Sequence, residues 1–512
     1  MNKITINVHR KPLRTIMVLI CCLLLFIAFL AFFSAKWYIN TYGQLGFDSI
    51  LYTLLSDLSG VEADLLIRYA ISSVVPAVIC TTLLSLFLFL SWEKKLVLRF
   101  LPKFRMTLFP VQRSLAILCS IACSIGFLYR AATISQFKDY LYHISERSTI
   151  FEDEYIDPEN TEITFPEKKR NLVYIFMESM ENTFFSVQQG GMLETSAIPE
   201  LYELAANNVN FSCNNGIGGL YASSGSVWTI GAMVSQTAGI PLKTPPGIGG
   251  NDYGQDDVFL PGVKSLIDIL HENGYYQTLM VGSDAKFGGR KAYFEGHGVD
   301  HIYDLYTARE DGIIEPDYSV WWGMEDSHLY RYAQQELTEI SAKDQPFAFF
   351  MLTVDTHHIG GYVCPYCEDS YTHQYENVLA CASKQLAGFL EWLQAQEFYE
   401  DISVVIVGDH PTMDEEYINT IGAGSFSRCI YNCFINSSVK PTKFRERVAF
   451  SLDMFPTTLA SMGCTIQGDR LGLGTNLFSD TPTLGEVMSG GGFNGELMKN
   501  SSYYTKKFFF ND

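Results

Sequence analysis

Three predicted strands are each followed by side chains that can bind a metal ion or transfer a proton. The strands are expected at 172–177, 347–354 and 402–407. In an open α/β sheet, ligands bind outside the carboxyl ends of the parallel strands. Two carboxylates with an imidazole form a ligand set for a divalent cation. The side chains that follow the three strands are, in chain order, Glu178, then His357 and His358, then Asp409 and His410.

Each of these sets also has an ordinary structural interpretation when it is taken alone. Glu178 could cap a following helix, because a carboxylate interacts favourably with the positive end of the helix dipole. Asp409 and His410 could simply form a turn. Because all three are expected at one edge of the same sheet, we favour a divalent-metal site.

A loop rich in glycine and serine, at 216–229, leads into an apolar helical run at 230–234. A hydroxyl at this junction would lie at a helix N-terminus, where unpaired N–H groups favour an anionic phosphate. Beside a metal ion the pKa of this hydroxyl would fall, which makes Thr229 a candidate nucleophile. Ordinary capping of the helix by Thr229 is the alternative. The rival hydroxyls in the loop are those of Ser223, Ser224 and Ser226.

The elements that must position these side chains alternate between strands and helices. A further strand is predicted at 276–281, with helices at 263–273 and 328–341. This alternation favours an α/β domain with a central, mainly parallel sheet. The predicted division is a transmembrane region at 1–130, a polar linker at 131–169, the α/β domain at 170–480 and a C-terminal surface tail or closing strand at 481–512.

The transmembrane region is predicted from three apolar stretches. A helix needs about 20 apolar residues to cross the hydrocarbon of a bilayer. The stretches lie at about 16–34, 69–92 and 114–129. A cleaved signal peptide is the alternative for the first stretch, and a buried soluble helix is the alternative for the short third one.

Basic residues predict the orientation, because Lys and Arg accumulate in cytoplasmic loops. The N-terminal arm and the segment between the second and third stretches are rich in them, and the segment between the first and second is mostly acidic. We therefore expect a multi-pass protein with its N-terminus inside and everything after Arg130 outside.

The charge of the chain is divided unevenly. The 512 residues carry a net charge of −20, of which residues 1–150 contribute +8 and residues 151–512 contribute −28. A phosphate backbone needs a basic surface, so we expect no nucleic-acid partner for the acidic part.

Twelve cysteines add a weaker signal. Five lie in the apolar stretches, and disulfides are plausible among the rest if the acidic part faces an oxidising compartment. Cys364 and Cys367 form a C-x-x-C, for which we favour a local disulfide or loop staple over zinc or redox catalysis. The cysteines outside the apolar stretches are Cys213, Cys364, Cys367, Cys381, Cys429, Cys433 and Cys464. Because seven is an odd number, at least one of these thiols must remain free of an intramolecular disulfide.

Several ordered motifs resemble the sulfatase-like branch of the alkaline phosphatase superfamily. Within it the chain most resembles the phosphoglycerol transferases of osmoregulated periplasmic glucans, with the lipoteichoic acid synthases as more distant relatives. The similarity covers about 165–480, and it is carried by NLVYIFMES (171–179), SVWTIGAMVSQTAGIPL (226–242), LTVDTHH (352–358), VGDHP (407–411), DMFPTT (453–458) and LGLGTNLFS (471–479).

The resemblance implies a role for each matching residue. It implies that Thr229 is the nucleophile that carries phosphoglycerol as a covalent intermediate, and that Arg290 and His357 hold the headgroup. His357 could act as general acid to the leaving alkoxide, or it could only form a hydrogen bond with the substrate. A tryptophan that the lipoteichoic acid synthases carry two residues before the arginine is replaced here by Gly288. The implied metal ligands are Glu178, Thr229, Asp409 and His410.

The leading hypothesis is therefore a metal-dependent transferase of a bacterial inner membrane, with its catalytic domain in the periplasm. It would move phosphoglycerol from phosphatidylglycerol to a periplasmic glucan or similar glycan, and release diacylglycerol. Oxygen-dominated ligands with one imidazole suit Mn²⁺ or Mg²⁺, with Zn²⁺ possible.

Three other functions compete with this hypothesis. A phosphoethanolamine transferase acting on lipid A or glycan is the nearest alternative. A non-catalytic membrane protein would need no metal ligands, which disfavours it. A true sulfatase needs a Cys or Ser in a C/S-x-P-x-R motif, and every Cys here fails that pattern.

Overall fold

The computed structural model describes residues 12–43, 47, 49–51, 63–90, 97–101, 104–107, 109–243 and 259–510. These residues form two compact units. The first unit comprises 1–40 and 62–139, and the second comprises 41–61 and 140–512.

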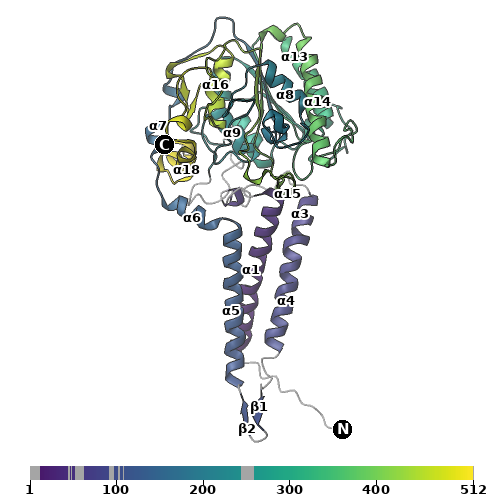
Figure 1. Ribbon diagram of the computed structural model, residues 1–512, viewed down its shortest axis with the longest axis vertical. Helices are drawn as coiled ribbons and strands as arrows, with labels where there is room; N and C mark the ends of the chain where they lie inside the picture. The colour runs from purple at the N-terminus through teal and green to yellow at the C-terminus, as the bar shows by residue number, and fades with distance from the viewer. Residues whose placement is uncertain are drawn as a thin grey trace. The chain divides into compact units, whose positions relative to one another are not determined.

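The first unit contains the three apolar helices that the sequence predicts (Figure 1). The candidate membrane spans are Ile16–Tyr42, Leu65–Leu88 and Ser114–Ile134, all long and apolar enough to cross a bilayer, which marks the chain as a membrane protein. The helices are α1 (Pro12–Tyr42), α3 (Ala63–Tyr69), continued through a π-helical turn (Ala70–Val74) into α4 (Val75–Leu90), and α5 (Phe109–Ile134).

Contacts between helices explain how this unit packs. The rings of Phe29 and Phe127 lie 4.6 Å apart, and the hydroxyls of Ser34 and Tyr69 are hydrogen-bonded at 2.9 Å. Between α4 and α5, β1 (Val97–Leu101) pairs antiparallel with β2 (Phe104–Thr107).

The second unit is built on a six-stranded sheet with the order β6-β5-β7-β4-β8-β9. All neighbouring strands are parallel except β8 and β9, so the expected mainly parallel α/β sheet is confirmed. The strands are β4 (Asn171–Met177), β5 (Tyr276–Val281), β6 (His301–Tyr303), β7 (Phe347–Leu352), β8 (Ile402–Gly408) and β9 (Asn432–Ile435). β6 and β9 were not predicted from the sequence, because strands of three or four residues are too short to show a periodic pattern.

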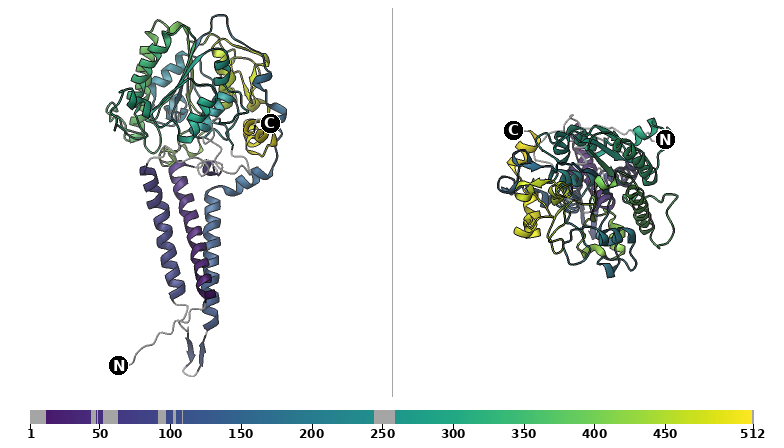
Figure 2. Two further views of the ribbon diagram at one scale, coloured as in Figure 1. Left: turned by 180° about the vertical axis from the view of Figure 1, so that it is seen from behind. Right: turned by 90° about the horizontal axis from the view of Figure 1, so that it is seen from above.

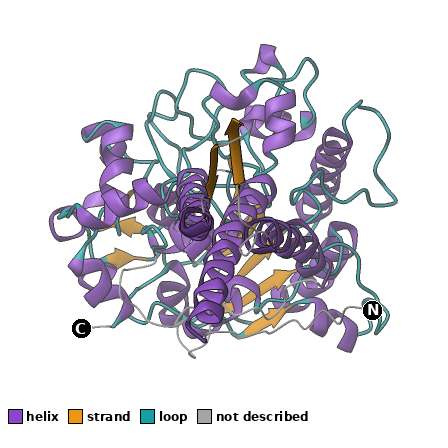
Figure 3. Cartoon of the chain, turned by 90° about the horizontal axis from the view of Figure 1, so that it is seen from below, coloured by secondary structure: helices purple, strands orange, loops and turns teal. Residues whose placement is uncertain are grey.

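Helices cover both faces of this sheet (Figure 3), and α13 and α14 lie side by side (Figure 2). Successive residues of β4 alternate between the two cores, with Tyr174 and Phe176 in one and Val173 and Ile175 in the other. The first core includes side chains of α9 (Thr229–Ala238), α10 (Leu266–Glu272), α11 (Arg290–Gly296) and α16 (Met454–Ser461). The second includes side chains of α8 (Pro199–Asn207), α12 (Leu305–Glu310), α13 (Asp326–Ser341), α14 (Gln374–Gln394) and α15 (Glu415–Thr420).

The segment expected to be a linker has its own structure. It holds α6 (Phe137–Ser145), α7 (Ile150–Glu154) and β3 (Ile163–Thr164). β3 pairs antiparallel with β10 (Thr465–Ile466), and a short hairpin follows from β11 (Arg470–Leu471) and β12 (Gly474–Thr475).

The C-terminal segment is helical, and not the surface tail or closing strand that its sequence suggested. It forms α17 (Leu484–Val487), α18 (Gly490–Met498), α19 (Ser502–Tyr504) and a π-helical turn (Thr505–Phe509). Phe508 is fully buried, 5.8 Å from the ring of Phe151 in α7. Burial of its aromatic residues therefore fixes this segment onto the domain.

Candidate active site

The ends of two adjacent parallel strands bring the predicted metal ligands together. Met177, the last residue of β4, is in register with Gly408, the last residue of β8. Glu178 therefore lies beside Asp409 and His410, and all three side chains are buried. One ligand atom from each lies within 4.8 Å of the other two.

Gly408 makes this close approach possible. A Cβ at this position would lie 1.9 Å from the carbonyl oxygen of Met180, in the loop that follows β4. Ser179, with φ of 55°, turns the chain directly after Glu178. Its amide then donates to Asp409 Oδ1 at 2.8 Å, and its hydroxyl donates to Glu178 Oε1 at 2.7 Å. The backbone is thus shaped around the carboxylates.

Thr229 is the first residue of α9, and its side chain faces this cluster. Its Oγ1 donates to Glu178 Oε2 at 3.5 Å and lies 3.5 Å from His410 Nε2. The N-cap residue of α9 is Trp228, whose side chain makes no capping hydrogen bond. Thr229 follows it as the first helical residue, so capping is not the role of the Thr229 hydroxyl.

Two of the three rival serines of the loop, Ser223 and Ser226, are engaged elsewhere. Ser226 Oγ lies 2.8 Å from Ser451 Oγ and 3.0 Å from Ser223 Oγ. Both serines are fully buried, and Ser235 joins the same hydroxyl cluster at 2.9 Å from Ser451. Hydroxyls that bond one another in the core are poorly placed to meet a substrate.

The arrangement fits a divalent cation. Asp409 Oδ1 accepts from the amides of Ser179 and His410, whereas Oδ2, fully buried, receives no hydrogen bond from the described residues. His410 Nδ1 lies 3.0 Å from the carbonyl oxygen of Pro411, which assigns the proton to Nδ1 and leaves the Nε2 lone pair facing the carboxylates. An orphaned carboxylate oxygen beside an imidazole lone pair is the donor set that a metal ion satisfies.

The electrostatics point the same way. Burial, and then the neighbouring Glu178, raise the pKa of Asp409 well above its usual value. Burial also acts to raise the pKa of Glu178, but the net shift is downward, because His357 and His410 in their protonated forms, the Ser179 hydroxyl and Arg290 all favour the carboxylate anion. Two adjacent buried carboxylates are stable as anions only beside positive charge.

Arg290 and His357, the two expected headgroup contacts, both lie close to this cluster. The charge of Arg290 helps to lower the pKa of Glu178 and of His357. Arg290 is buried at the start of α11, where it donates to Ser283 Oγ at 3.0 Å and to the carbonyl oxygen of Asp284 at 2.7 Å. Its guanidinium is therefore held in one orientation.

His357 lies in the loop after β7 and is half-buried. Its Nδ1 lies 2.7 Å from the carbonyl oxygen of His358, and burial lowers its pKa. At neutral pH the imidazole is therefore uncharged, with the proton on Nδ1 and the lone pair on Nε2.

Trp322, which was not predicted from the sequence, packs beside His357 and Phe287. Its ring lies 4.7 Å from that of His357 and 5.4 Å from that of Phe287. The guanidinium of Arg290 lies 5.6 Å from the Phe287 ring. An aromatic surface thus stands beside Arg290 although Gly288 occupies the expected tryptophan position. No motif or periodicity marks the loop that carries Trp322.

This fold and this site define a protein of the alkaline phosphatase superfamily, in which a mainly parallel sheet presents acidic and histidine side chains at its carboxyl edge. The chain belongs to the sulfatase family, because the family model Sulfatase matches residues 170–464.

Known proteins agree with this assignment. Phosphoglycerol transferase I of Escherichia coli (strain 55989 / EAEC) is 31% identical over 265 residues, which cover 50% of this chain and 33% of that protein. Phosphoglycerol transferase I of Xanthomonas campestris pv. campestris is 27% identical over 331 residues, covering 63% and 44%. The chain thus matches less than half the length of these relatives.

Among solved structures, the integral membrane protein lipooligosaccharide phosphoethanolamine transferase A from Neisseria meningitidis has a similar fold. The TM-score is 0.51 at 14% identity, and the match covers 87% of this chain and 84% of that one.

Proposed function

We propose that this protein is a membrane-anchored transferase that moves phosphoglycerol from phosphatidylglycerol to a periplasmic glucan or similar glycan, and releases diacylglycerol. The observation that carries the proposal is the position of the Thr229 hydroxyl, 3.5 Å from both Glu178 Oε2 and His410 Nε2. The similarity to phosphoglycerol transferase I supports glycerol as the headgroup.

The proposed metal is Mn²⁺ or Mg²⁺, with Zn²⁺ as the alternative. Its ligands would be Glu178, Thr229, Asp409 and His410. When bound, the cation supplies a lowered hydroxyl pKa at Thr229 and neutralises charge on the nonbridging phosphate oxygens.

In the first step, Thr229 Oγ1 forms a bond to phosphorus, and the bond from phosphorus to the diacylglycerol oxygen breaks. The leaving oxygen takes up one proton and departs as diacylglycerol, which balances the one proton that the Thr229 hydroxyl loses as it attacks. The hydrogen bond from Thr229 to Glu178 Oε2 directs the hydroxyl proton away from the phosphorus. The first N–H groups of α9 and the guanidinium of Arg290 stabilise the negative charge on the phosphate.

In the second step, a glycan hydroxyl attacks the phosphothreonine and restores Thr229. His357 is suited to accept the proton of that hydroxyl, because its pKa is lowered and its Nε2 carries a lone pair. In the first step the same nitrogen can accept a hydrogen bond from the glycerol headgroup. The ring of Trp322 packs against His357 and would fix its orientation.

The membrane spans fit this chemistry. A catalytic domain tethered to a bilayer meets lipid headgroups at high effective concentration. We propose that the spans lie in the bacterial inner membrane and that the catalytic domain faces the periplasm, as the distribution of basic residues indicates.

The test uses the full-length protein in vesicles of phosphatidylglycerol labelled in the headgroup glycerol, with and without Mn²⁺. We expect metal-dependent release of diacylglycerol and transfer of label to the protein. Thr229→Ala should abolish both, whereas Ser224→Ala, the half-buried rival in the same loop, should retain both. Retention of both activities in Thr229→Ala, with their loss in Ser224→Ala, would remove Thr229 from the mechanism.

Phosphoethanolamine transfer to lipid A or glycan is the second candidate, and the fold shared with the Neisseria phosphoethanolamine transferase is the observation in its favour. A parallel set of vesicles containing phosphatidylethanolamine distinguishes the two. Labelled ethanolamine on Thr229, with no labelled glycerol, would select this candidate.

A further inference from the structure

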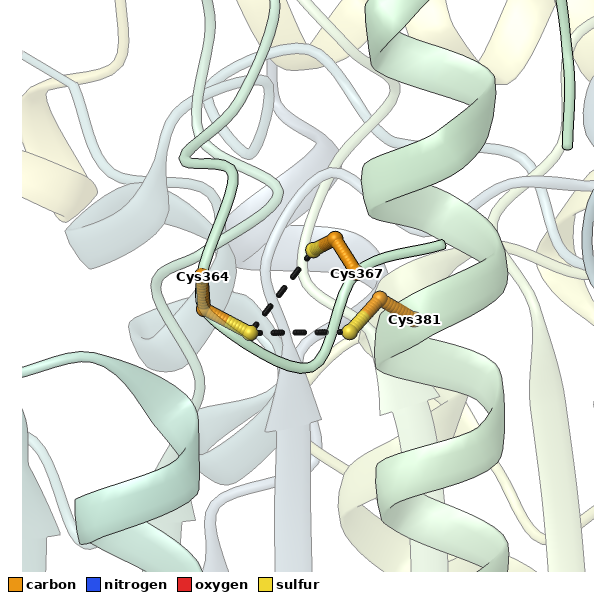
Figure 4. A group of neighbouring side chains, drawn as sticks. All are labelled: Cys364, Cys367 and Cys381. Carbon is orange, nitrogen blue, oxygen red and sulfur yellow. Dashed lines mark hydrogen bonds between the residues drawn. The ribbon is translucent and has the colours of Figure 1, made fainter. Parts of the chain in front are cut away.

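Three cysteines that the proposed chemistry does not use meet between a loop and a helix. Cys364 and Cys367 lie in the loop after β7, and Cys381 lies on α14 (Figure 4). The Sγ atom of Cys364 is 3.6 Å from that of Cys381 and 3.7 Å from that of Cys367. The turn between the first two is closed by a hydrogen bond of 3.0 Å from the amide of Cys367 to the carbonyl oxygen of Cys364.

These separations match the edges of a metal tetrahedron. Sulfur ligands of zinc lie about 2.3 Å from the ion, so two of them in a tetrahedral site are about 3.8 Å apart. The three Sγ atoms all lie within 4.8 Å of one another, so one ion can reach all of them. A C-x-x-C turn with a further ligand on a helix is also a common zinc-binding arrangement.

A side-chain amide donates to two of the three sulfur atoms, an interaction that suits the thiolate form in which cysteine binds metal. Gln385 lies one turn after Cys381 on α14, and its Nε2 donates to Cys381 Sγ at 3.3 Å and to Cys364 Sγ at 3.7 Å. Second-shell donors of this kind orient and stabilise metal-bound thiolates.

We propose that Cys364, Cys367 and Cys381 form a second metal site, separate in its ligands from the acidic one, which binds Zn²⁺ or a similarly thiophilic divalent cation. The fourth ligand would be water, because Cys381 and Gln385 line a cavity of about 650 Å³ beside the site. Its ligands come from thiolate groups, whereas those of the acidic site are oxygen and imidazole, so the two sites select different cations.

The site would fasten the loop between β7 and α14. That loop carries His357, and its buried residue Cys364 contacts Cys381 on the helix. Binding of a cation therefore stabilises the loop without contact with substrate.

A disulfide between two of the three thiols is the competing arrangement. An oxidising compartment favours it, and it would leave the third cysteine as a free thiol. Cys213 and Cys429, with Sγ atoms 3.5 Å apart and no third cysteine beside them in the described chain, provide a matched pair for comparison.

The test uses full-length protein in detergent, purified without reductant, stripped of metal and titrated with Co²⁺. Thiolate ligands give a charge-transfer absorption band that oxygen and imidazole ligands do not give. We expect this band in the unaltered protein, its displacement by Zn²⁺, and its loss in each of Cys364→Ser, Cys367→Ser and Cys381→Ser. It should persist in Cys213→Ser and in Asp409→Asn.

A second measurement needs no variant. In the native protein, Zn²⁺ should protect these three cysteines, but not Cys213, from alkylation by iodoacetamide. Peptide mass spectrometry identifies which cysteines are alkylated. Three outcomes would overturn the proposal. The absorption band could be absent in the unaltered protein, it could persist in all three serine variants, or mass spectrometry without reductant could find a disulfide between two of the three cysteines. None of these outcomes depends on phosphoglycerol transfer.

Discussion

Thr229 Oγ1 lies 3.5 Å from His410 Nε2, although 181 residues separate the two along the chain. One stands at the start of α9 and the other just beyond the end of β8. The proposed nucleophile at a helix N-terminus and a proposed metal ligand at a strand end thus lie side by side. This is the relationship on which the predictions about catalysis depend.

Asp409→Asn should abolish the acidic metal site. The substitution replaces the buried carboxylate whose Oδ2 has no hydrogen bond from the described residues, and we expect Mn²⁺ affinity to fall at least about 100-fold. Isothermal titration calorimetry with the full-length protein measures this loss. Asp469→Asn, away from the strand ends, is the control, and equal Mn²⁺ affinity in both variants would contradict the assignment.

Arg290→Lys should lower kcat about 100-fold, since an ammonium cannot reproduce the oriented guanidinium that stabilises phosphate charge. Arg290 is held by Ser283 Oγ and the carbonyl oxygen of Asp284, and a lysine lacks the geometry for both. Lys291→Ala removes the neighbouring, exposed charge and should change kcat little. Similar losses in both variants would show that a general basic patch matters, and not the fixed guanidinium.

Trp322→Ala should raise KM or lower kcat by about 5- to 10-fold, the effect of losing one aromatic contact of about 1 kcal/mol. Its ring packs on His357 and Phe287, so its removal frees the imidazole to rotate. Trp321→Ala is the control, because that ring stacks on Tyr362 at 6.4 Å instead. Unchanged kinetics of Trp322→Ala would exclude this tryptophan from the site.

Asp453 should make the domain less stable as pH rises. Burial raises its pKa from 3.8 to about 7 in the folded state, so the folded protein binds this proton more tightly than the unfolded one does. The stabilisation is complete below about pH 4 and is lost as pH rises through about 7.

Thermal unfolding between pH 4 and 8 checks this dependence. Asp453→Asn has no proton to lose, so its melting temperature should decrease less with pH than that of the unaltered protein. Parallel curves for the two proteins would show that Asp453 does not titrate in this range. The side chain accepts hydrogen bonds from the amides of Phe450 and Thr475, which the variant can only partly keep, so its slope with pH is the informative quantity.

Much of the fold could be predicted because its signals are local. The apolar stretches of the membrane spans and the strands of the central sheet are each visible as a continuous pattern. The helical C-terminal segment was missed, because burial of Phe508 against α7 is a distant contact that no local pattern records.

The order of residues along the chain was enough to predict that Glu178, Asp409 and His410 would meet, because each follows a strand and parallel strands in one sheet end at one edge. The three-dimensional packing was needed to show which hydroxyl of the loop faces them, that Trp322 packs beside His357, and that Cys381 joins the C-x-x-C turn. Strand ends are ordered by backbone hydrogen bonding, whereas loops and helix faces are brought together by packing between segments far apart in the chain, which one sequence does not encode as a repeating pattern.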